Sequence, residues 1–285
     1  MRINTNINSM RTQEYMRQNQ DKMNTSMNRL SSGKSINSAA DDAAGLAIAT
    51  RMRAKEGGLN VGARNTQDAM SAIRTGDAAL GSISNILLRM RDLATQASSG
   101  TNNLTDSASL EKEYQQLGEE IDHIAQKTNF NGNAFLNSAD ADPTKKGTDI
   151  TIQLSDAAND VMKITAIDAT VDTLLGSAIG SLTHATDSAA AITAATAEMK
   201  KIDTAIQNVA DHRATFGSQL NRLDHNLNNV TSQSTNMAAA ASQIEDADMA
   251  KEMSNMTKFK ILNEAGISML SQANQTPQMV SKLLQ

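Results

Sequence analysis

The sequence has 285 residues but no cysteine and no tryptophan, only two prolines and only 2% aromatic residues. Because there is no cysteine, disulfide bonds and thiolate metal sites are excluded. Large aromatic rings usually supply much of the burial in a globular core. Here alanine, leucine, isoleucine and 16 methionines must supply it, and such side chains suit long helices that approach each other closely. Proline breaks helices, so its scarcity leaves almost the whole chain free to be helical.

Three further absences limit the classes of function. No stretch approaches 18 consecutive apolar residues, so the sequence predicts no transmembrane span. Residues 1–9 contain no apolar segment, so no signal peptide of the general secretory type is expected. The formal net charge is only -5, which gives no reason to expect nucleic acid or a membrane as a partner.

The chain does contain apolar residues at alternating steps of three and four, the spacing of helices that pack along their length. The first run is Ile73, Gly76, Leu80, Ile83, Leu87, Met90, Ala94 and Ala97. The second is Leu110, Tyr114, Leu117, Ile121 and Ile124. The third is Met199, Ile202, Ile206, Val209, Arg213, Phe216, Leu220, Leu223, Leu227 and Val230, in which only Arg213 is charged. These runs predict three long helices in a bundle. Its core is expected to contain Leu80, Ile83, Leu87, Met90, Leu117, Ile121, Ile206, Val209, Leu220, Leu223 and Leu227.

Turn and capping residues predict where the helices stop. Gly33 and Gly100 each follow a helical stretch and can end it in the left-handed conformation. Candidate N-caps are Thr105 or Asp106 for the second helix and Asp187 or Ser188 for the third.

Between the second and third helices, apolar and polar residues alternate. The apolar positions are Ile150, Ile152 and Leu154, then Met162, Ile164 and Ala166, and a polar loop at residues 155–160 separates the two sets. This pattern predicts one short β-hairpin. No second domain large enough to fold alone is expected.

Both ends of the chain are helical in pattern but poor in residues that a single chain could bury. Residues 1–32 carry five cations and two anions, a net charge of +3, and residues 236–285 carry a net charge of -1. Isolated helices of this kind are marginally stable in water. We expect the two ends to pair with each other and to need further copies of the chain for stable burial. Frayed termini are the alternative.

Several stretches at both ends closely resemble bacterial flagellins. They are residues 1–10, Arg29-Leu-Ser-Ser-Gly-Lys34, Ile36-Asn-Ser38, Asp41-Asp-Ala-Ala-Gly-Leu-Ala-Ile48, Ser242-Gln-Ile-Glu-Asp-Ala-Asp-Met249 and Ile267-Ser-Met-Leu-Ser-Gln-Ala-Asn-Gln275. The resemblance covers residues 1–135 and 200–285 in the order that the family has.

The resemblance implies a structural subunit that self-assembles into the extracellular flagellar filament for motility, with no enzymatic activity and no cofactor. The implied fold is mainly α: heptad-patterned helices forming a rod-like bundle with a small β-hairpin, plus paired terminal helices that form an inner tube. The implied segments are a tube helix and connecting spoke at residues 1–45, rod helices at 46–135, a hairpin and outward-facing segment at 136–186, a rod helix at 187–235 and a tube helix at 236–285.

The resemblance also implies partners. These are further copies of the chain, an export chaperone at the C-terminal segment, the filament cap and the hook-associated proteins. Export through the flagellar type III apparatus would explain an extracellular protein without a cleavable signal peptide.

Recognition by a host is implied at two places. The stretch Leu88-Arg-Met-Arg-Asp-Leu-Ala-Thr-Gln96 is similar to the segment bound by the Toll-like receptor that senses flagellin. The resemblance implies receptor contacts at Arg89 and Leu93 in this stretch and at Glu113 in the next helix. Leu88 stands where flagellins usually have Gln. Val280, Leu283 and Leu284 match an apolar cluster read by a cytosolic immune sensor. In the plainer interpretation, Arg89 lies on a solvated face between subunits and the C-terminal cluster is buried in the tube.

Catalytic and metal chemistry find no support. His123, His184, His212 and His225 are scattered, and the two that share a helix are too far apart to bind one metal. Asp41 and Asp42 are adjacent and diverge on a helix, so they are expected to bind backbone N–H groups at a turn or helix start. A hook–filament junction protein and a secreted α-helical adhesin or toxin-translocation protein are the alternative functions.

Overall fold

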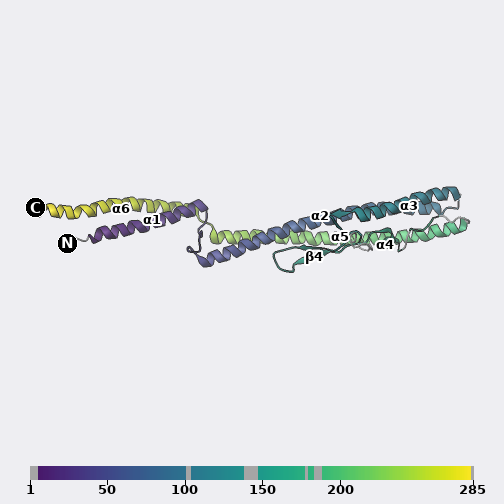
Figure 1. Ribbon diagram of the computed structural model, residues 1–285, viewed down its shortest axis with the longest axis horizontal. Coiled ribbons are helices and arrows are strands. Elements are labelled where there is room, and N and C mark those ends of the chain that lie inside the picture. The colour runs from purple at the N-terminus through teal and green to yellow at the C-terminus, as the bar shows by residue number, and fades with distance from the viewer. Residues whose placement is uncertain (1–5, 101–103, 138–146, 177–178, 183–187, 284–285) are drawn as a thin grey trace. The chain divides into compact units, whose positions relative to one another are not determined.

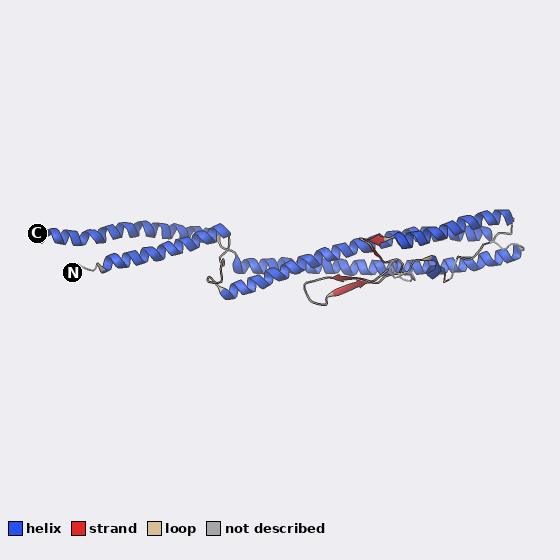
Figure 2. Ribbon diagram, viewed as in Figure 1, coloured by secondary structure: helices blue, strands red, loops and turns tan. Residues whose placement is uncertain are grey.

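The computed structural model describes residues 6–100, 104–137, 147–176, 179–182 and 188–283 (Figures 1 and 2). In chain order the elements are α1 (Ile7–Ser32), α2 (Ala43–Ala97), α3 (Leu104–Lys127), β1 (Asn129–Phe130), β2 (Asn133–Ala134), β3 (Ile150–Gln153), β4 (Val161–Ile164), α4 (Val171–Leu175), α5 (Ser188–Glu245) and α6 (Met249–Leu283). The prediction of a mainly helical fold with long packed helices is confirmed.

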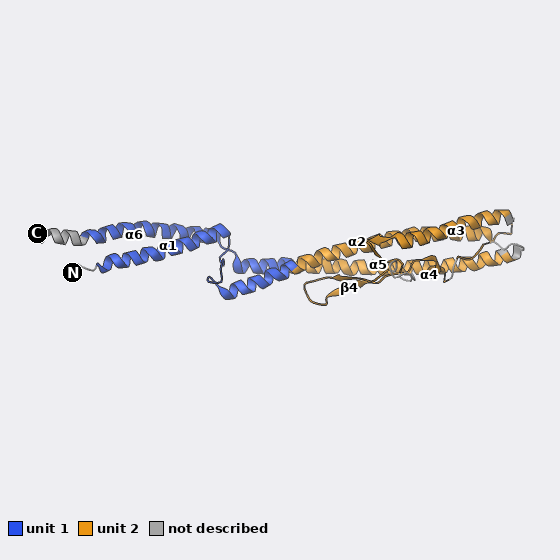
Figure 3. Cartoon of the chain, viewed as in Figure 1, with its two compact units in different colours: residues 1–57, 234–285 blue, residues 58–233 orange. Residues whose placement is uncertain are grey.

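The chain forms two compact units, each taken from separate parts of the sequence (Figure 3). The first contains residues 1–57 and 234–285, and the second contains residues 58–233. The helices α2 and α5 contribute residues to both units. α5 runs without a break through residues 235 and 236, where the sequence-based division was placed.

In the second unit, α2, α3 and α5 pack along their length. Every position of the first heptad run is buried, from Ile73 to Ala97. Ion pairs join the helices at the surface: Arg89 of α2 pairs with Glu113 of α3, and Arg91 of α2 pairs with Asp203 of α5. Inside, the rings of Phe135 and Phe216 meet edge to face, with their centroids 6.4 Å apart. Leu80, Ile83, Leu87 and Met90 are fully buried, as the heptad pattern predicts.

The innermost line of α5 differs from the predicted one at every second position. Ile202, Val209, Phe216, Leu223 and Val230 are buried as predicted. The other inward-facing positions are Ala195 and Glu198, which precede Ile202, and Ala205 and Gln219, whereas the predicted Met199, Ile206 and Leu220 are only partly buried. Leu227 is also partly exposed, and Arg213 is exposed and pairs with Asp77. The apolar pattern therefore identified the correct face but placed its centre one residue away, because small and polar residues occupy half of the innermost line.

The same shift occurs in α3. Tyr114, Ile121 and Ala125 are buried, while the predicted Leu110, Leu117 and Ile124 lie at the edge of the core. A helix packed between two neighbours buries a wider stripe of residues than the narrow a/d seam of a coiled coil, so the buried face of α3 extends beyond the predicted positions.

The predicted hairpin is confirmed as an antiparallel pair of β3 and β4, with Ile152 opposite Met162. Leu154 and Ala166 lie just outside these strands. A second small hairpin, β1 with β2, was not predicted. Its turn is Asn131-Gly132, with φ of 51° and 83°, and an Asn-Gly pair between two strands is the sequence signal that could have found it.

One of the predicted helix ends is confirmed and others are wrong. Gly33 ends α1 as predicted: its φ is 72° and its N–H donates to the Arg29 carbonyl at 2.9 Å. Gly100 does not take a left-handed φ, so that prediction is wrong. Thr105 and Asp106 lie inside α3, which already begins at Leu104, so neither is the N-cap. α5 begins at Ser188, and Asp187 lies outside the described residues.

Glu245, at the end of α5, joins three segments of the first unit. Its buried carboxylate accepts hydrogen bonds from Arg53 Nε at 3.0 Å and pairs with Lys34 Nζ at 3.1 Å. The Glu245 carbonyl also accepts a hydrogen bond from the N–H of Ser35, and the Gly33 carbonyl accepts one from the N–H of Ala247. Nearby, Arg29 of α1 lies within ion-pair distance of both Asp41 and Glu252. The entry into α2 and the exit from α5 are thus tied to the base of α1 and α6.

We predict that Leu223→Ala destabilises the monomer by about 2–5 kcal/mol, the usual range for a fully buried leucine. Leu220→Ala should remove about half of that or less, because Leu220 is only partly buried. Urea unfolding of the two monomeric variants measures the difference. Equal losses would show that the two leucines are equally central to the core.

A second prediction concerns pH. The hydrogen bonds from Arg53, followed by those from Lys34, lower the pKa of Glu245 below its ordinary value. A carboxylate with a lowered pKa stabilises the fold above its unfolded pKa of about 4.3, and this contribution is lost as the pH falls through the folded pKa. Thermal unfolding should therefore show Glu245→Gln to be less stable than the parent at pH 7. The two should converge below about pH 3. A gap that is constant over this range would contradict the ionic role.

Candidate functional site

The helices α1 and α6 lie side by side and form what we call the terminal helix pair (Figure 1). Polar groups join them along their length: Asn6 Nδ2 donates to the Ala273 carbonyl at 2.9 Å, and Asn263 Nδ2 donates to Gln20 Oε1 at 2.7 Å. Lys22 Nζ lies 5.8 Å from the ring centroid of Phe259. The predicted pairing of the two ends is confirmed.

The helices also approach each other closely at Gly266. A Cβ atom added there would lie 2.8 Å from Cγ of Met16, closer than side chains tolerate. A larger residue at this position would require Met16 or the helix backbone to shift.

The terminal helix pair has almost no core of its own. The buried residues of α1 are Ser9 and Ser26, and among the described side chains of α6 only Glu252 is buried. No apolar side chain described in either helix is fully removed from solvent. Packing within one chain therefore leaves the apolar content of both helices largely uncovered.

Large apolar side chains instead lie on the outside of the pair. The described residues include fourteen exposed large apolar side chains, and ten of them belong to α1 and α6. These ten are 41–64% exposed: Ile7, Met10, Tyr15, Met27, Met249, Met253, Ile261, Leu262, Ile267 and Met269. Exposed apolar surface of this extent is typical of a face that another molecule covers.

Charged residues are interspersed among these apolar ones. On α1, Glu14 accepts hydrogen bonds from Gln18 and Arg17, and these bonds lower the pKa of its carboxyl group. The surface of the pair therefore carries charged side chains beside its apolar ones.

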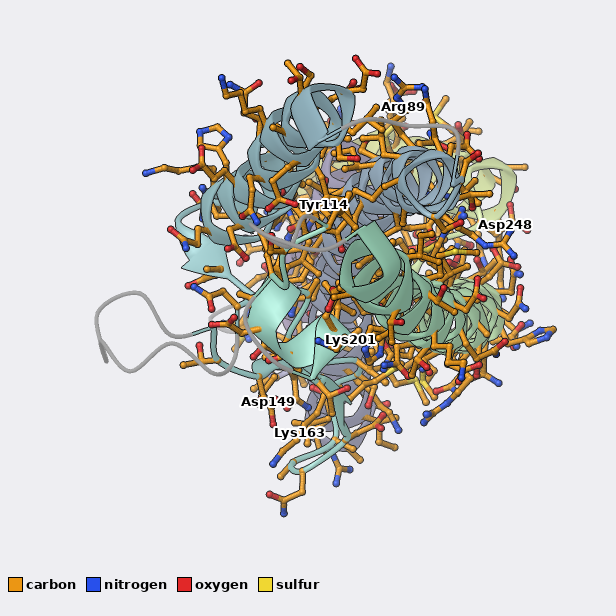
Figure 4. The ribbon with its side chains drawn as sticks, turned by 90° about the vertical axis from the view of Figure 1, so that its right-hand side faces the viewer. Arg89, Tyr114, Asp149, Lys163, Lys201 and Asp248 are labelled. Carbon is orange, nitrogen blue, oxygen red and sulfur yellow. The ribbon has the colours of Figure 1, made fainter. Side chains whose placement is uncertain are left out.

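The two charged residues assigned to receptor recognition meet on the second unit. Arg89 Nε donates to Glu113 Oε1 at 2.8 Å, and about half of each side chain is exposed. Figure 4 shows Arg89 at the outer side of its helix and Tyr114 turned inward between helices. Leu88 is 47% exposed beside them. Leu93, the expected apolar contact, is 1% exposed and packs in the core, so only Arg89 and Glu113 reach the surface.

The three residues assigned to the cytosolic sensor cannot be placed. Leu284 lies outside the described residues. Val280 and Leu283 fall within α6, but their side chains also lie outside the described ones.

Asp41 and Asp42 bind backbone N–H groups, as predicted. Asp42 Oδ1 accepts from Ala44 and Gly45 at the start of α2. Asp41 Oδ2 accepts from Ser38 and Asn37, and these hydrogen bonds lower its pKa. Both carboxylates therefore fix the chain between α1 and α2.

The buried polar cluster at Glu198 was not predicted. Its carboxylate accepts from Tyr114 Oη at 3.3 Å and Lys201 Nζ at 2.7 Å. Burial, and then the nearby charge of Glu198, raise the pKa of Tyr114. The cluster joins α3 to α5, and the heptad pattern could not reveal it because Glu198 is polar.

Among the described residues, no group of three or more His, Asp or Glu side chains could hold a metal ion. His184 lies outside these residues, and burial lowers the pKa of His212. Within the part of the chain that the structure describes, no helix has the length and hydrophobicity to cross a membrane.

Comparison with known proteins identifies the family. Residues 3–141 match the bacterial flagellin N-terminal helical region, and residues 199–284 match the C-terminal helical region. The flagellin of Listeria innocua is 44% identical over 293 aligned residues, covering 100% of this chain and 99% of that protein. The flagellin of Bacillus subtilis is 39% identical and covers both chains completely.

A solved structure agrees with these relatives. The crystal structure of Bacillus cereus flagellin is 65% identical and superimposes with a TM-score of 0.51, covering 62% of this chain and 94% of that one. Full-length matches to flagellins favour a filament subunit over a junction protein or an adhesin. The chain belongs to the bacterial flagellins: it is a structural subunit of the extracellular flagellar filament, which drives motility, and it is not an enzyme.

Proposed function

We propose that the terminal helix pair is the surface through which this flagellin polymerises with copies of itself. In this proposal α1 and α6 of neighbouring subunits pack together and form the inner tube of the filament. The exposed apolar side chains of the pair would then be buried between subunits.

The observation that carries the proposal is the absence of an apolar core in the terminal helix pair. Ten large apolar side chains lie exposed on two helices whose buried side chains, among the described ones, are two serines and one glutamate. Fully burying a large apolar side chain contributes about 1.5–3 kcal/mol. A few such burials per subunit are enough to drive association, once the loss of translational and rotational freedom is offset.

We further infer that the second unit, together with the adjoining residues 46–57 and 234–235 of the first, supplies the rod around this tube. Residues 46–135 and 187–235 would form the rod, and residues 136–186 would face outward. Residues 1–45 and 236–285 would form the tube and its connection. The burial of the heptad seam supports this division, because the seam needs no second subunit to complete it.

We propose four kinds of protein partner for the subunit and its polymer. An export chaperone would cover the apolar residues of the C-terminal segment before assembly, among them Ile261 and Leu262. The filament cap and the hook-associated proteins would contact the ends of the polymer. A cytosolic immune sensor would read Val280, Leu283 and Leu284.

The Toll-like receptor that senses flagellin is a further proposed partner, at Arg89 and Glu113. Arginine presents a rigid fork of donors and is enriched where interfaces derive most of their affinity. The exposed Arg89–Glu113 pair could contact a receptor without unfolding the helices. The buried Leu93 would act by supporting α2 beneath Arg89.

The assembly proposal predicts that the double substitution Ile261→Asp and Ile267→Asp abolishes polymerisation. Both side chains are more than half exposed, so the melting temperature of the monomer should change little. The matched control is Val161→Asp, an exposed apolar residue of β4 in the outward-facing segment, which should still polymerise. Sedimentation and electron microscopy after seeding measure assembly. Normal filaments from the double variant would contradict the tube assignment.

For receptor recognition, Arg89→Ala should lower activation by monomeric protein about tenfold or more. The control is Arg213→Ala, which breaks a comparably exposed ion pair with Asp77 on α2 and should leave activation unchanged. Leu88→Gln should raise activation, because it restores the residue usual in flagellins. Dose–response curves in receptor-reporter cells decide. Equal curves for Arg89→Ala and the parent would show that Arg89 is not part of a receptor-binding site.

A further inference from the structure

Methionine is the main oxidisable side chain of this protein. The chain has no cysteine and no tryptophan, and one of its two tyrosines, Tyr114, is fully buried. A mild two-electron oxidant therefore meets 16 thioethers and no thiol that would compete for it.

The exposed methionines are confined to the terminal helix pair. Among the described side chains, five methionines are exposed, and all five lie in α1 or α6: Met10, Met27, Met249, Met253 and Met269. In the second unit, Met90 and Met162 are buried, and Met70 and Met199 are partly buried. Half of the ten exposed apolar residues of the pair are thus methionines, which we call the exposed methionine set.

We propose that the exposed methionine set is an oxidation site that blocks polymerisation of the free subunit. The oxidant would be of the hydroperoxide class, such as hydrogen peroxide. Its O–O bond breaks, one oxygen atom forms a bond to the methionine sulfur, and the peroxide is reduced to water. The sulfur loses two electrons and becomes methionine sulfoxide. This inference rests on the proposed assembly role of the terminal helix pair.

Oxidation converts an apolar side chain of the proposed interface into a polar one. Methionine fills irregular gaps because it is flexible, apolar and polarisable. The sulfoxide is polar and carries a strong acceptor oxygen, which must be desolvated when it is buried against apolar neighbours. In the free subunit the same oxygen remains hydrated. Oxidation therefore penalises the polymer and leaves the fold of the monomer intact.

The order of events also follows from exposure. The sulfur atoms are open to oxidant in the free subunit and would be shielded once the pair is buried between subunits. The filament would then resist an oxidant that disables subunits not yet assembled.

The experiment treats full-length monomer with hydrogen peroxide at neutral pH, removes the peroxide and seeds polymerisation. Peptide mass spectrometry measures the sulfoxide at each methionine. We expect the exposed set to be oxidised before Met90 and Met162. The critical concentration should rise about tenfold or more at an unchanged monomer melting temperature.

Two variants and one enzyme control for the sites involved. Replacing the exposed set by leucine conserves size and apolarity, so this variant should polymerise before and after peroxide. Replacing Met70 and Met199 by leucine should leave polymerisation as sensitive as in the parent. A methionine sulfoxide reductase with a thiol reductant should restore assembly of the oxidised parent, and this rescue keeps the test decisive if the five-leucine variant fails to polymerise.

The possible failures are distinguishable. If the oxidised parent polymerises at an unchanged critical concentration, or if the five-leucine variant polymerises but is equally sensitive, the oxidation proposal is wrong and the assembly surface stands. If the exposed set is oxidised as fast in filaments as in monomers, the terminal helix pair is not buried in the filament. In that case the proposed function itself is wrong.

Discussion

The two helices of the terminal helix pair lie against each other without burying an apolar core among their described side chains. This is the constraint on which the rest of the structure depends. α1 and α6 meet through amide hydrogen bonds and at Gly266, which lies against Met16, while ten large apolar side chains of the pair stay exposed. The pairing therefore covers only part of the apolar content of the two helices. The exposed residues remain available for other copies of the chain, which is the physical requirement for a subunit that is stable alone and more stable in a polymer.

The second unit shows the opposite arrangement, because its apolar residues are covered within one chain. The seam of α2 is buried throughout, and the polar positions of α5 that face inward are partly satisfied, as Glu198 is by Tyr114 and Lys201. Within the first unit, Glu245 at the end of α5 binds Arg53 of α2 and Lys34, which follows α1, and so joins these three segments.

Periodicity predicted the helices well and their inner faces less well. The α2 seam was correct at every position because its inward residues are apolar or small, so pattern and burial coincide. In α5 the inward-facing Glu198 and Gln219 are polar, so a search for apolar residues does not find them. The partly buried Leu220 and Ile206 were predicted as core residues instead. The β1–β2 hairpin was missed because two-residue strands are too short to show alternation. The candidate site was predictable as two ends lacking a core. Which side chains stay outside could not be predicted, because that depends on how α1 and α6 turn towards each other.

A monomer that exposes ten large apolar side chains on its terminal helices alone must avoid binding the wrong partners before assembly. Charged residues occur among these side chains, as Arg11, Glu14 and Arg17 do between Met10 and Met27 in the sequence. Charges of this kind limit the continuous apolar area, and large continuous apolar patches promote non-specific association. A partner must then match many small apolar areas and the charges between them at once, and a helix pair from another copy of the same chain can offer such a pattern. The exposed apolar residues of the terminal helices therefore favour association, and the charges among them favour partners that carry a matching pattern.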